Sequence, residues 1–328
     1  MKEKIAVVGG GAWGTALATV AAEGGREVDI YAREAEVVAS VNHYHENKAF
    51  LPGAILNSTV YAKPMTDFVN CNTKHIIWTV PTQFSRQTAR DYKEVLTGRN
   101  VLNASKGIEI DTGKLVIQAL EEEIDADFSI LSGPSFAKEV ALKKPTTVSL
   151  SSAKEELAGW WQKELSVSYF RIYTSNDVVG LEVGGALKNV IAVATGISDG
   201  LHFDHNARAG LVTRGLAEIS RFGVAYGAKK ETFMGLAGLG DLVLTATVDN
   251  SRNRQVGIRL AEGFTIDEIM SKTNTVAEGV FTAKAVYKVS QERGISMPIC
   301  TEVYKIIHEG KTALDSAWDL MHRPLSAE

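Results

Sequence analysis

Short apolar runs alternate with helical patterns along the first half of the chain. Runs such as HIIWTV and NVLNAS have the apolar or β-branched character of strands in a covered sheet. The pattern predicts strands near 4–8, 27–32, 58–62, 75–80, 100–104, 128–132, 145–150 and 167–173, and helices near 12–24, 34–46, 82–96, 113–124, 135–142 and 153–164. Such alternation is typical of a doubly wound, mainly parallel sheet. The last strand or two lie past the regular pattern, so an antiparallel direction stays open for them.

After Asn176 the strand patterns stop. The rest of the chain predicts a long helix over NARAGLVTRGLAEISRFGVAYGA and further helices near 251–263, 265–272, 278–293 and 298–309. Thr265 precedes Glu268 by three residues, which is the spacing of a capping box. Because 328 residues exceed what one core usually covers, we predict two domains, an α/β domain at 1–176 and an all-helical domain at 177–328.

The composition of the chain mainly argues against nucleic-acid binding, membrane insertion and metal binding. A formal net charge of −4 provides no general attraction to nucleic acid or to an anionic membrane. The uncharged stretch Ile5–Ala22 resembles a signal peptide or a membrane span, but three glycines interrupt it, so a buried strand, turn and helix explain it better. The two cysteines fit no metal or redox spacing, and the histidine pairs His43/His45 and His202/His205 lack a metal-ligand framework. We therefore expect a reduced cytosolic protein without a metal site.

The first predicted strand and helix enclose the pattern Gly9-x-Gly11-x-x-Gly14. In a dinucleotide fingerprint the first glycine allows a tight turn, the second lets the backbone approach a pyrophosphate, and the third allows close helix–strand packing. The helix start supplies free amides and the positive end of the dipole. The position between a strand and a helix therefore predicts dinucleotide binding, and a glycine-rich turn of another α/β fold is the alternative.

The end of the second predicted strand indicates which dinucleotide binds. In an NAD site an acidic residue at this strand end binds the ribose hydroxyl. Here Asp29 lies too early in the strand, and Arg33 follows its end. An arginine suits a 2′-phosphate through charge-assisted hydrogen bonds, which favours NADP and leaves NAD possible. The alternative for Arg33 is a solvated loop charge.

Further polar groups occur where this architecture binds ligands. Lys106 ends a predicted strand, at the carboxyl edge of the sheet. Ser135 follows Gly133-Pro134 and is placed to cap a helix whose free amides would bind an anion or an amide. A helix opens at Ser251 with Arg252 and Arg254 in its first turn. Since cations oppose the dipole at that end, either an anion sits there or the loop is exposed and tolerates the charge.

Lys188 is unusual because it lies in the apolar stretch GGALKNVIAVATG. On a helix its neighbours at three and four residues are glycines and apolar residues, so the helix itself supplies no counter-charge. Asp241, in the apolar run GLAGLGDLVLTAT, is a candidate partner from elsewhere in the chain. The alternative is a lysine that extends to the surface from a packed helix.

Taken together, these stretches resemble the bacterial-type NAD(P)-dependent glycerol-3-phosphate dehydrogenases. The resemblance rests on GGGAWGTALA, NASKGIE, LSGPSFAKEV, EVGGALKNVIAVATGISDG, NARAGLVTRGLAEI, GLAGLGDLVLT, SRNRQVG, VAEGVFTA and MPI, which occur in this order over nearly the whole chain. It implies a Rossmann-type domain followed by an all-helical domain. One departure is HFDHN at 202–206, where the family often has Gly-Asp-Asn.

The resemblance also implies functional residues. The catalytic lysine of the family falls on Lys188. The substrate positions fall on Lys106, Gly133, Ser135, Lys188, Asp241, Ser251, Arg252 and Asn253. Beside the fingerprint glycines Gly9, Gly11 and Gly14, the cofactor positions fall on Ala12, Trp13, Arg33, Phe50, Lys106, Ala137, Arg252, Val276 and Glu278. Position 12 is often serine in the family, so only its backbone is expected to make contact.

The implied reaction is hydride transfer between NADP or NAD and C2 of glycerol 3-phosphate, which gives dihydroxyacetone phosphate. It would supply glycerol 3-phosphate for phospholipid synthesis in the cytoplasm, with small-molecule substrates, no nucleic acid, no membrane insertion and a possible homodimer. Two alternatives stay open. One is a dehydrogenase of the same architecture that acts on a 3-hydroxy acid or sugar acid, and the other is a non-catalytic NADP(H) sensor.

Overall fold

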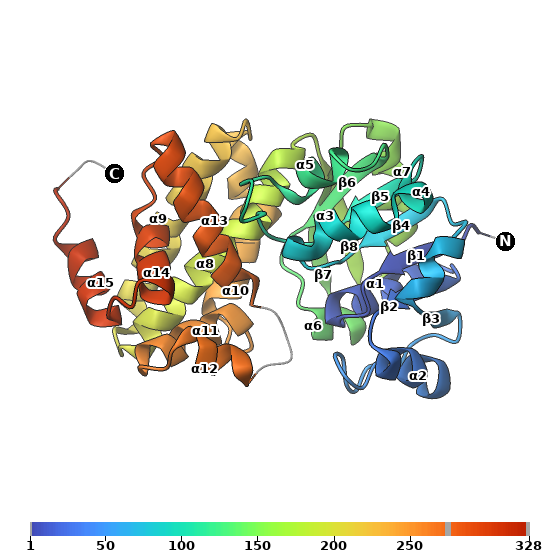
Figure 1. Ribbon diagram of the computed structural model, residues 1–328, viewed down its shortest axis with the longest axis horizontal. Helices are drawn as coiled ribbons and strands as arrows, with labels where there is room; N and C mark the ends of the chain where they lie inside the picture. The colour runs from blue at the N-terminus through green and yellow to red at the C-terminus, as the bar shows by residue number, and fades with distance from the viewer. Residues whose placement is uncertain (1, 273–276, 326–328) are drawn as a thin grey trace. The chain divides into compact units, whose positions relative to one another are not determined.

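The computed structural model describes residues 2–272 and 277–325 (Figure 1). The chain forms two compact units. The first consists of Met1–Ser105 and Val116–Leu181, and the second of Lys106–Leu115 and Glu182–Glu328. The short segment Lys106–Leu115 therefore groups with the C-terminal unit, although it lies in the N-terminal half of the sequence. The two units are described separately below.

The first unit is built on one eight-stranded sheet with the strand order β3-β2-β1-β4-β5-β6-β7-β8. The strands are β1 Ile5–Val8, β2 Val28–Ala32, β3 Val60–Pro64, β4 His75–Trp78, β5 Asn100–Asn103, β6 Asp127–Ser132, β7 Thr146–Ser152 and β8 Phe170–Ser175. All neighbouring pairs are parallel except β6 and β7, which are antiparallel, while β8 runs parallel to β7. The first six strands have the Rossmann order, so the predicted fold class is confirmed.

Helices cover both faces of this sheet (Figure 1). They are α1 Ala12–Glu23, α2 Ala35–Tyr44, η1 Met65–Asn70, α3 Thr82–Asp91, α4 Lys93–Leu96, α5 Val116–Glu121, α6 Ala137–Ala141 and α7 Glu155–Leu165. Helix α1 packs with α6 and α7, and α3 packs with α5. Strands β1, β4 and β5 have four residues each, and every one of these residues is buried, as expected for strands covered on both faces.

Three helical predictions in this unit need correction. The predicted helix 82–96 divides at Tyr92, whose φ of −117° and ψ of 26° are not helical and whose hydroxyl donates to the Met65 carbonyl. The predicted helix 113–124 begins only at Val116, because Gly113 has a φ of +70° and Leu115 bridges to Ile108. The short 3₁₀ helix η1 was not predicted, since six residues carry too little periodicity to be recognised.

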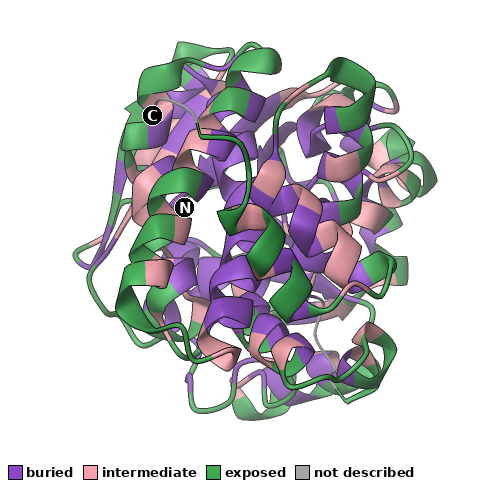
Figure 2. Cartoon of the chain, turned by 90° about the vertical axis from the view of Figure 1, so that its left-hand side faces the viewer, coloured by how far each residue is buried: buried purple, intermediate pink, exposed green. Residues whose placement is uncertain are grey.

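The second unit is all-helical over its described residues. Its helices are α8 Val178–Gly200, α9 Asp204–Ala225, η2 Lys230–Met234, the π-helical turn η3 Leu236–Gly240, α10 Asp241–Thr247, α11 Arg252–Ala261, α12 Ile266–Ser271, α13 Glu278–Arg293, α14 Pro298–His308 and α15 Ala313–Met321. The predicted capping box is present, because Thr265 and Glu268 bond reciprocally at the start of α12. In Figure 2 the helices alternate buried and exposed segments, as amphipathic helices around a core do.

Helix α8 is the core of this unit. It is long and apolar enough to cross a membrane, but 89% of its most apolar window is buried inside the structure. It crosses α11 at unusually short range. A Cβ at Gly257 would lie 2.1 Å from the Val193 carbonyl oxygen, and a Cβ at Gly196 would lie 2.0 Å from that of Arg254. Glycine at both positions lets the two backbones touch, which fixes the first turns of α11 against α8.

This crossing generates a stability prediction. Gly257→Ala should lower the free energy of unfolding by about 3 kcal/mol, because the new methyl meets rigid backbone on α8. Gly210→Ala is the matched control, since nothing lies within 4 Å of a Cβ at that helical position. The control should gain about 0.5–1 kcal/mol from its better helix propensity. Urea unfolding of both variants measures the difference, and equal stabilities would contradict the close crossing.

Candidate functional site

The turn between β1 and α1 has the backbone geometry of a nucleotide cradle. Gly9 has a φ of +115°, and a Cβ there would lie 2.5 Å from the Thr79 hydroxyl. A Cβ at Gly14 would lie 2.1 Å from the Gly9 carbonyl oxygen, so only glycine lets α1 pack this closely against β1. No atom lies within 4 Å of a Cβ at Gly11, the N-cap of α1. The first and third glycines therefore serve the turn and the packing, and the second leaves its surface open to a ligand.

Two side chains, Trp13 and Asn47, hold the surroundings of this turn by hydrogen bonds. The Trp13 indole in the first turn of α1 donates to the Ala104 carbonyl at 3.1 Å. Asn47, which is buried, donates to the Gly10 carbonyl at 2.8 Å and accepts from the amide of Phe50 at 3.1 Å. Asn47 thus ties the segment of Phe50 to the glycine turn. The sequence analysis did not single it out, because an asparagine after a helix carries no motif of its own.

The end of β2 separates Arg33 from Asp29. Asp29 is buried in the strand and is bound by Lys4 at 3.2 Å and by Lys63 at 2.8 Å. Its carboxylate is therefore occupied within the protein and is not at the strand end. Arg33 follows the strand with 82% of its side chain exposed and contacts Glu34 at 3.1 Å. A guanidinium in this position remains accessible to an anionic ligand.

The stretch after β6 departs from one expectation. Gly133 has a φ of +140°, and a Cβ there would lie 3.0 Å from the Val148 Cα. Ser135 does not cap the following helix, because its hydroxyl donates to the Gly133 carbonyl at 2.9 Å and Phe136 is the N-cap of α6. The predicted cap is therefore wrong. Ala137 is the first residue of α6.

In the helical unit, one buried carboxylate joins two lysines. Lys188 Nζ donates to Asp241 Oδ1 at 2.6 Å, and Lys106 Nζ donates to Asp241 Oδ2 at 2.6 Å. The Thr245 hydroxyl lies 2.7 Å from Lys188 Nζ and donates to the Asp241 carbonyl. Lys188 is 6% exposed and Asp241 is 1% exposed. Lys188 therefore does not extend to the surface, and its counter-charge is the carboxylate that the sequence suggested.

Close backbone packing brings these groups together. Asp241 begins α10 directly after the π-helical turn η3, whose wide turn is closed by the bond from Gly240 N to the Gly235 carbonyl. Gly184, one turn before Lys188, allows η3 to approach α8, because a Cβ there would lie 2.3 Å from the Ala237 carbonyl oxygen. The glycine provides a close backbone contact rather than a cavity beside the lysine.

Lys106 reaches the cluster from a segment that the helical unit holds in place. The Lys288 ammonium donates to the Asp111 carbonyl at 2.7 Å, and the Tyr226 hydroxyl donates to the Gly113 carbonyl at 2.7 Å. These bonds attach the segment Lys106–Leu115 to α13 and α9. A lysine that is remote in sequence is thereby fixed beside Asp241.

Burial governs the protonation of Lys188. Burial lowers its pKa to about 8, against the opposing effect of the Asp241 carboxylate, and the positive charges of Lys106 and Arg252 lower it further. The ammonium and the amine forms of Lys188 are therefore both accessible near neutral pH. A residue with this property, placed beside other polar groups, is suited to general acid–base catalysis.

The first turn of α11 presents a second polar group. Ser251 is its N-cap, and its hydroxyl accepts from the Arg254 amide at 3.4 Å. Asn253 is buried, donates to Asn189 at 2.9 Å and accepts from the Gly279 amide at 3.0 Å. Among the described residues Arg252 makes no hydrogen bond or ion pair, whereas Arg254 is bound by carboxylates. Arg252 is thus the cation of this turn that is accessible to a ligand.

Of the two remaining predicted positions, one lies within the described residues. Glu278 is the first residue of α13, and Val276 lies outside the described residues. The sequence analysis missed Thr245 and Asn189, which contact Lys188 and Asn253. The signal for Thr245 was its position one helical turn after Asp241, which places both side chains on one face. Over the described ranges 2–272 and 277–325, no group of three potential metal ligands occurs.

Comparison with known proteins matches both parts of the chain. Residues 4–158 match the family model of the NAD-dependent glycerol-3-phosphate dehydrogenase N-terminus, and residues 177–317 match that of the C-terminus. Proteins named glycerol-3-phosphate dehydrogenase [NAD(P)+] from Nitratidesulfovibrio vulgaris and Citrifermentans bemidjiense are 47% and 44% identical. The first alignment covers 99% of this chain and 100% of the relative, and the second covers 100% and 99%.

A solved structure agrees with these relatives. The crystal structure of glycerol-3-phosphate dehydrogenase from Coxiella burnetii is 35% identical, with a TM-score of 0.94, and the match covers 98% of this chain and 99% of that one. The resemblance seen in the sequence motifs is therefore confirmed in both sequence and fold.

Proposed function

Because the chain belongs to the NAD-dependent glycerol-3-phosphate dehydrogenase family, we propose that it interconverts glycerol 3-phosphate and dihydroxyacetone phosphate by hydride transfer with NADP or NAD. The observation that carries this proposal is the buried Lys188 bound to Asp241. It places a proton donor and acceptor with a pKa of about 8 next to polar groups suited to a phosphorylated substrate.

The residues of the α/β unit fit a dinucleotide. Gly11 leaves open space at the start of α1, where the helix amides and the dipole favour a pyrophosphate. When bound, the nicotinamide supplies the hydride acceptor or donor. The exposed guanidinium of Arg33 supports a preference for NADP, since its only ion pair among the described residues is with the neighbouring Glu34 and a 2′-phosphate would offer stronger charge-assisted hydrogen bonds. We assign Ala12, Trp13, Phe50 and Ala137 of this unit to the cofactor, and we assign Lys106, Arg252, Val276 and Glu278 of the helical unit to it as well.

Lys188 handles the proton in this proposal. During oxidation the C2 hydrogen leaves with its electron pair as a hydride, the neutral amine of Lys188 takes the hydroxyl proton, and a carbonyl forms at C2. During reduction the Lys188 ammonium returns that proton to the oxygen at C2. Asp241 orients the lysine and stabilises its charged form, and Thr245 fixes the same nitrogen from another direction.

The substrate phosphate is assigned to the first turn of α11. Arg252 makes no hydrogen bond or ion pair among the described residues, although the Glu278 carboxylate acts on it electrostatically, and the amides of this turn add the positive end of the helix dipole. Ser251 and Asn253 flank it, and Lys106 provides a second ammonium at the Asp241 end. Gly133 and Ser135 of the α/β unit are assigned to the same substrate. In this assignment the alcohol carbon of the substrate lies at Lys188 and Asp241, and the substrate phosphate lies at the first turn of α11.

The proposal also covers where and how the enzyme acts. We propose that it works in the cytoplasm, supplies glycerol 3-phosphate for phospholipid synthesis and forms a homodimer. A candidate dimer surface is α15, where Leu314, Trp318 and Met321 are exposed by 61%, 63% and 82% and recur at helical spacing. The boundary between the dinucleotide and substrate domains is assigned near residue 176.

A substrate panel tests the reaction. Dihydroxyacetone phosphate should be reduced with NADPH, while 3-keto acids and sugar-acid analogues without phosphate should react slowly, because they leave Arg252 unpaired.

Lys188→Met should lower kcat by about a thousandfold and change the affinity for NADPH less than about twofold, since only proton transfer is lost. Lys305→Met is the matched control, because that lysine contacts Glu302 on α14 and should retain normal kcat. Normal turnover in Lys188→Met would show that Lys188 does not transfer the proton. If the wild-type protein binds the nucleotide but turns over no substrate of the panel, the result would favour a sensor.

The cofactor preference rests on Arg33. Arg33→Ser should raise the KM for NADPH about tenfold by removing one charge-assisted contact, and should leave the KM for NADH nearly unchanged. Arg171→Ser is the control, since that exposed arginine on β8 stacks on Tyr173 and is not assigned to the nucleotide. Initial-rate measurements with both nucleotides decide the point. An equal change in both KM values would mean that Arg33 does not read the 2′-phosphate.

A further inference from the structure

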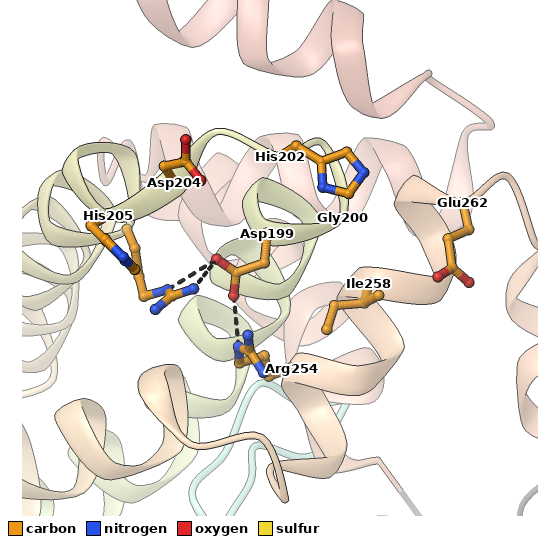
Figure 3. Close-up of a pocket in the computed structure, with 9 residues that line it drawn as sticks. Asp199, Gly200, His202, Asp204, His205, Arg254, Ile258 and Glu262 are labelled. Atoms are coloured by element: carbon orange, nitrogen blue, oxygen red, sulfur yellow. Dashed lines mark hydrogen bonds and ion pairs between the residues drawn. The ribbon is translucent and has the colours of Figure 1, made fainter.

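A charge cluster of Asp199, Arg208 and Arg254 lies at the C-terminal end of α8, eleven residues after Lys188. Figure 3 shows the ion pairs of Asp199. Asp199 Oδ1 accepts from Arg208 Nη2 at 2.6 Å and from Arg208 Nε at 2.9 Å, and Asp199 Oδ2 accepts from Arg254 Nε at 2.6 Å. The side chains of Asp199 and Arg254 are each 8% exposed. One carboxylate therefore joins the C-terminal end of α8 to the N-terminal parts of α9 and α11. The proposed reaction makes no use of any of the three.

Each member of the pair Asp199–Arg254 is unfavourable in its own helix. Asp199 lies in the last turn of α8, where the dipole repels an anion, and Arg254 lies in the first turn of α11, where it repels a cation. The ion pair offsets both unfavourable placements at once. Because both charges are buried, removal of one leaves the other with a single remaining partner, Arg208 for Asp199 and Asp249 for Arg254.

The cluster fixes the helix that carries the proposed phosphate site. Arg254 follows Arg252 by two residues, and its carbonyl packs directly on Gly196 of α8. Its guanidinium then reaches Asp199 less than one turn further along α8. Backbone contact and ion pair together restrict both the position and the rotation of the first turn of α11. That rotation decides where the side chain of Arg252 points.

The cavity beside the cluster does not provide a better explanation of these charges. It measures about 330 Å³ and is lined by Asp199, His202, Asp204, Arg208, Arg254 and Glu262, among others (Figure 3). Three carboxylates oppose two guanidinium groups, and both guanidinium groups already bind Asp199. An anionic ligand would have to displace that carboxylate. The charges are thus arranged to pair with each other.

We propose that Asp199 is a positioning residue, which acts through Arg254 to orient the first turn of α11 and so to place Arg252 for the substrate phosphate. This inference rests on the proposed function for its effect on the substrate, but the orientation of α11 is a property of the protein alone. Arg208 reinforces Asp199 from α9 and is not itself part of the path to Arg252.

Substitution of Asp199 tests the proposal in two independent measurements. Asp199→Asn keeps the shape of the side chain and removes its charge, so it should raise the KM for dihydroxyacetone phosphate at least tenfold while kcat changes less than about threefold. Hydrogen exchange followed by mass spectrometry should show faster exchange of the amides of residues 252–256 in the enzyme without ligands. Asp199→Glu should recover part of both effects, because it restores a carboxylate.

Asp249→Asn is the matched control. Asp249 also binds Arg254, at 2.8 Å, but its side chain is 89% exposed, so its removal should change the KM less than about twofold. A large effect of Asp249→Asn equal to that of Asp199→Asn would contradict the role of the buried pair.

The remaining outcomes separate this proposal from the proposed function. Unchanged exchange at residues 252–256 in Asp199→Asn would overturn the positioning role, whatever the kinetics. Faster exchange with a loss confined to kcat would overturn the link to the phosphate. If Asp199→Asn does not fold, Arg254→Lys provides the same two readouts with the charge retained, and it should show a smaller increase in the KM for dihydroxyacetone phosphate. If the wild-type enzyme does not reduce dihydroxyacetone phosphate, the proposed function fails, while the exchange measurement still decides whether Asp199 orients α11.

Discussion

The site depends on one buried carboxylate, Asp241, that holds two lysine ammonium groups. A buried charge is tolerated only when partners replace its hydration, and each oxygen of Asp241 receives one lysine at 2.6 Å. The cluster carries one more positive than negative charge. It is therefore stable enough to form and still attracts an anionic substrate. Removal of Asp241 would leave the buried Lys188 and the partly exposed Lys106 without their shared counter-charge.

Close helix packing makes this arrangement possible. Gly184 lets the η3 turn touch α8, and Gly196 and Gly257 let α11 touch it further along. A single apolar helix thereby presents Lys188 to α10 at one point and fixes the first turn of α11 at another. The same glycines have low helix propensity, so the packing that organises the site lowers the local stability of the helices.

Local patterns predicted the α/β unit well, because its strands and helices repeat with clear periods. The glycine turn, the place of Arg33 after β2 and the eight strands all lie close to their predicted residues. The sequence also indicated the pairing of Lys188 with Asp241, since neither charge had a partner on its own helix. The failures were short elements. The turn η1 and the run that forms η3 and α10 are too short or too uniformly apolar to have a readable period, and α15 was missed as well.

Long-range partners could not be predicted from pattern alone. Lys106 is separated from Asp241 by 135 residues and reaches it on a segment that departs from the rest of its half of the sequence. The two arginines of α11 show the same limit. Their position left either an anion or an exposed loop open, and only the structure separates Arg254, which binds Asp199 and Asp249, from Arg252, which makes no hydrogen bond or ion pair among the described residues. From the sequence alone it cannot be decided whether the anion beside each arginine is a carboxylate of the protein or a bound ligand.

The most direct test of the central claim is the pH dependence of hydride transfer in both directions, measured by single-turnover absorbance of the nicotinamide. Oxidation needs the neutral amine of Lys188, so its rate should rise with pH and level off above about 8, the pKa set by burial against Asp241. Reduction needs the ammonium, so its rate should be constant at low pH and fall above the same value. Rates that change in the same sense in both directions, or that show no inflection near this pKa, would contradict the assignment of Lys188 as the proton-transfer group.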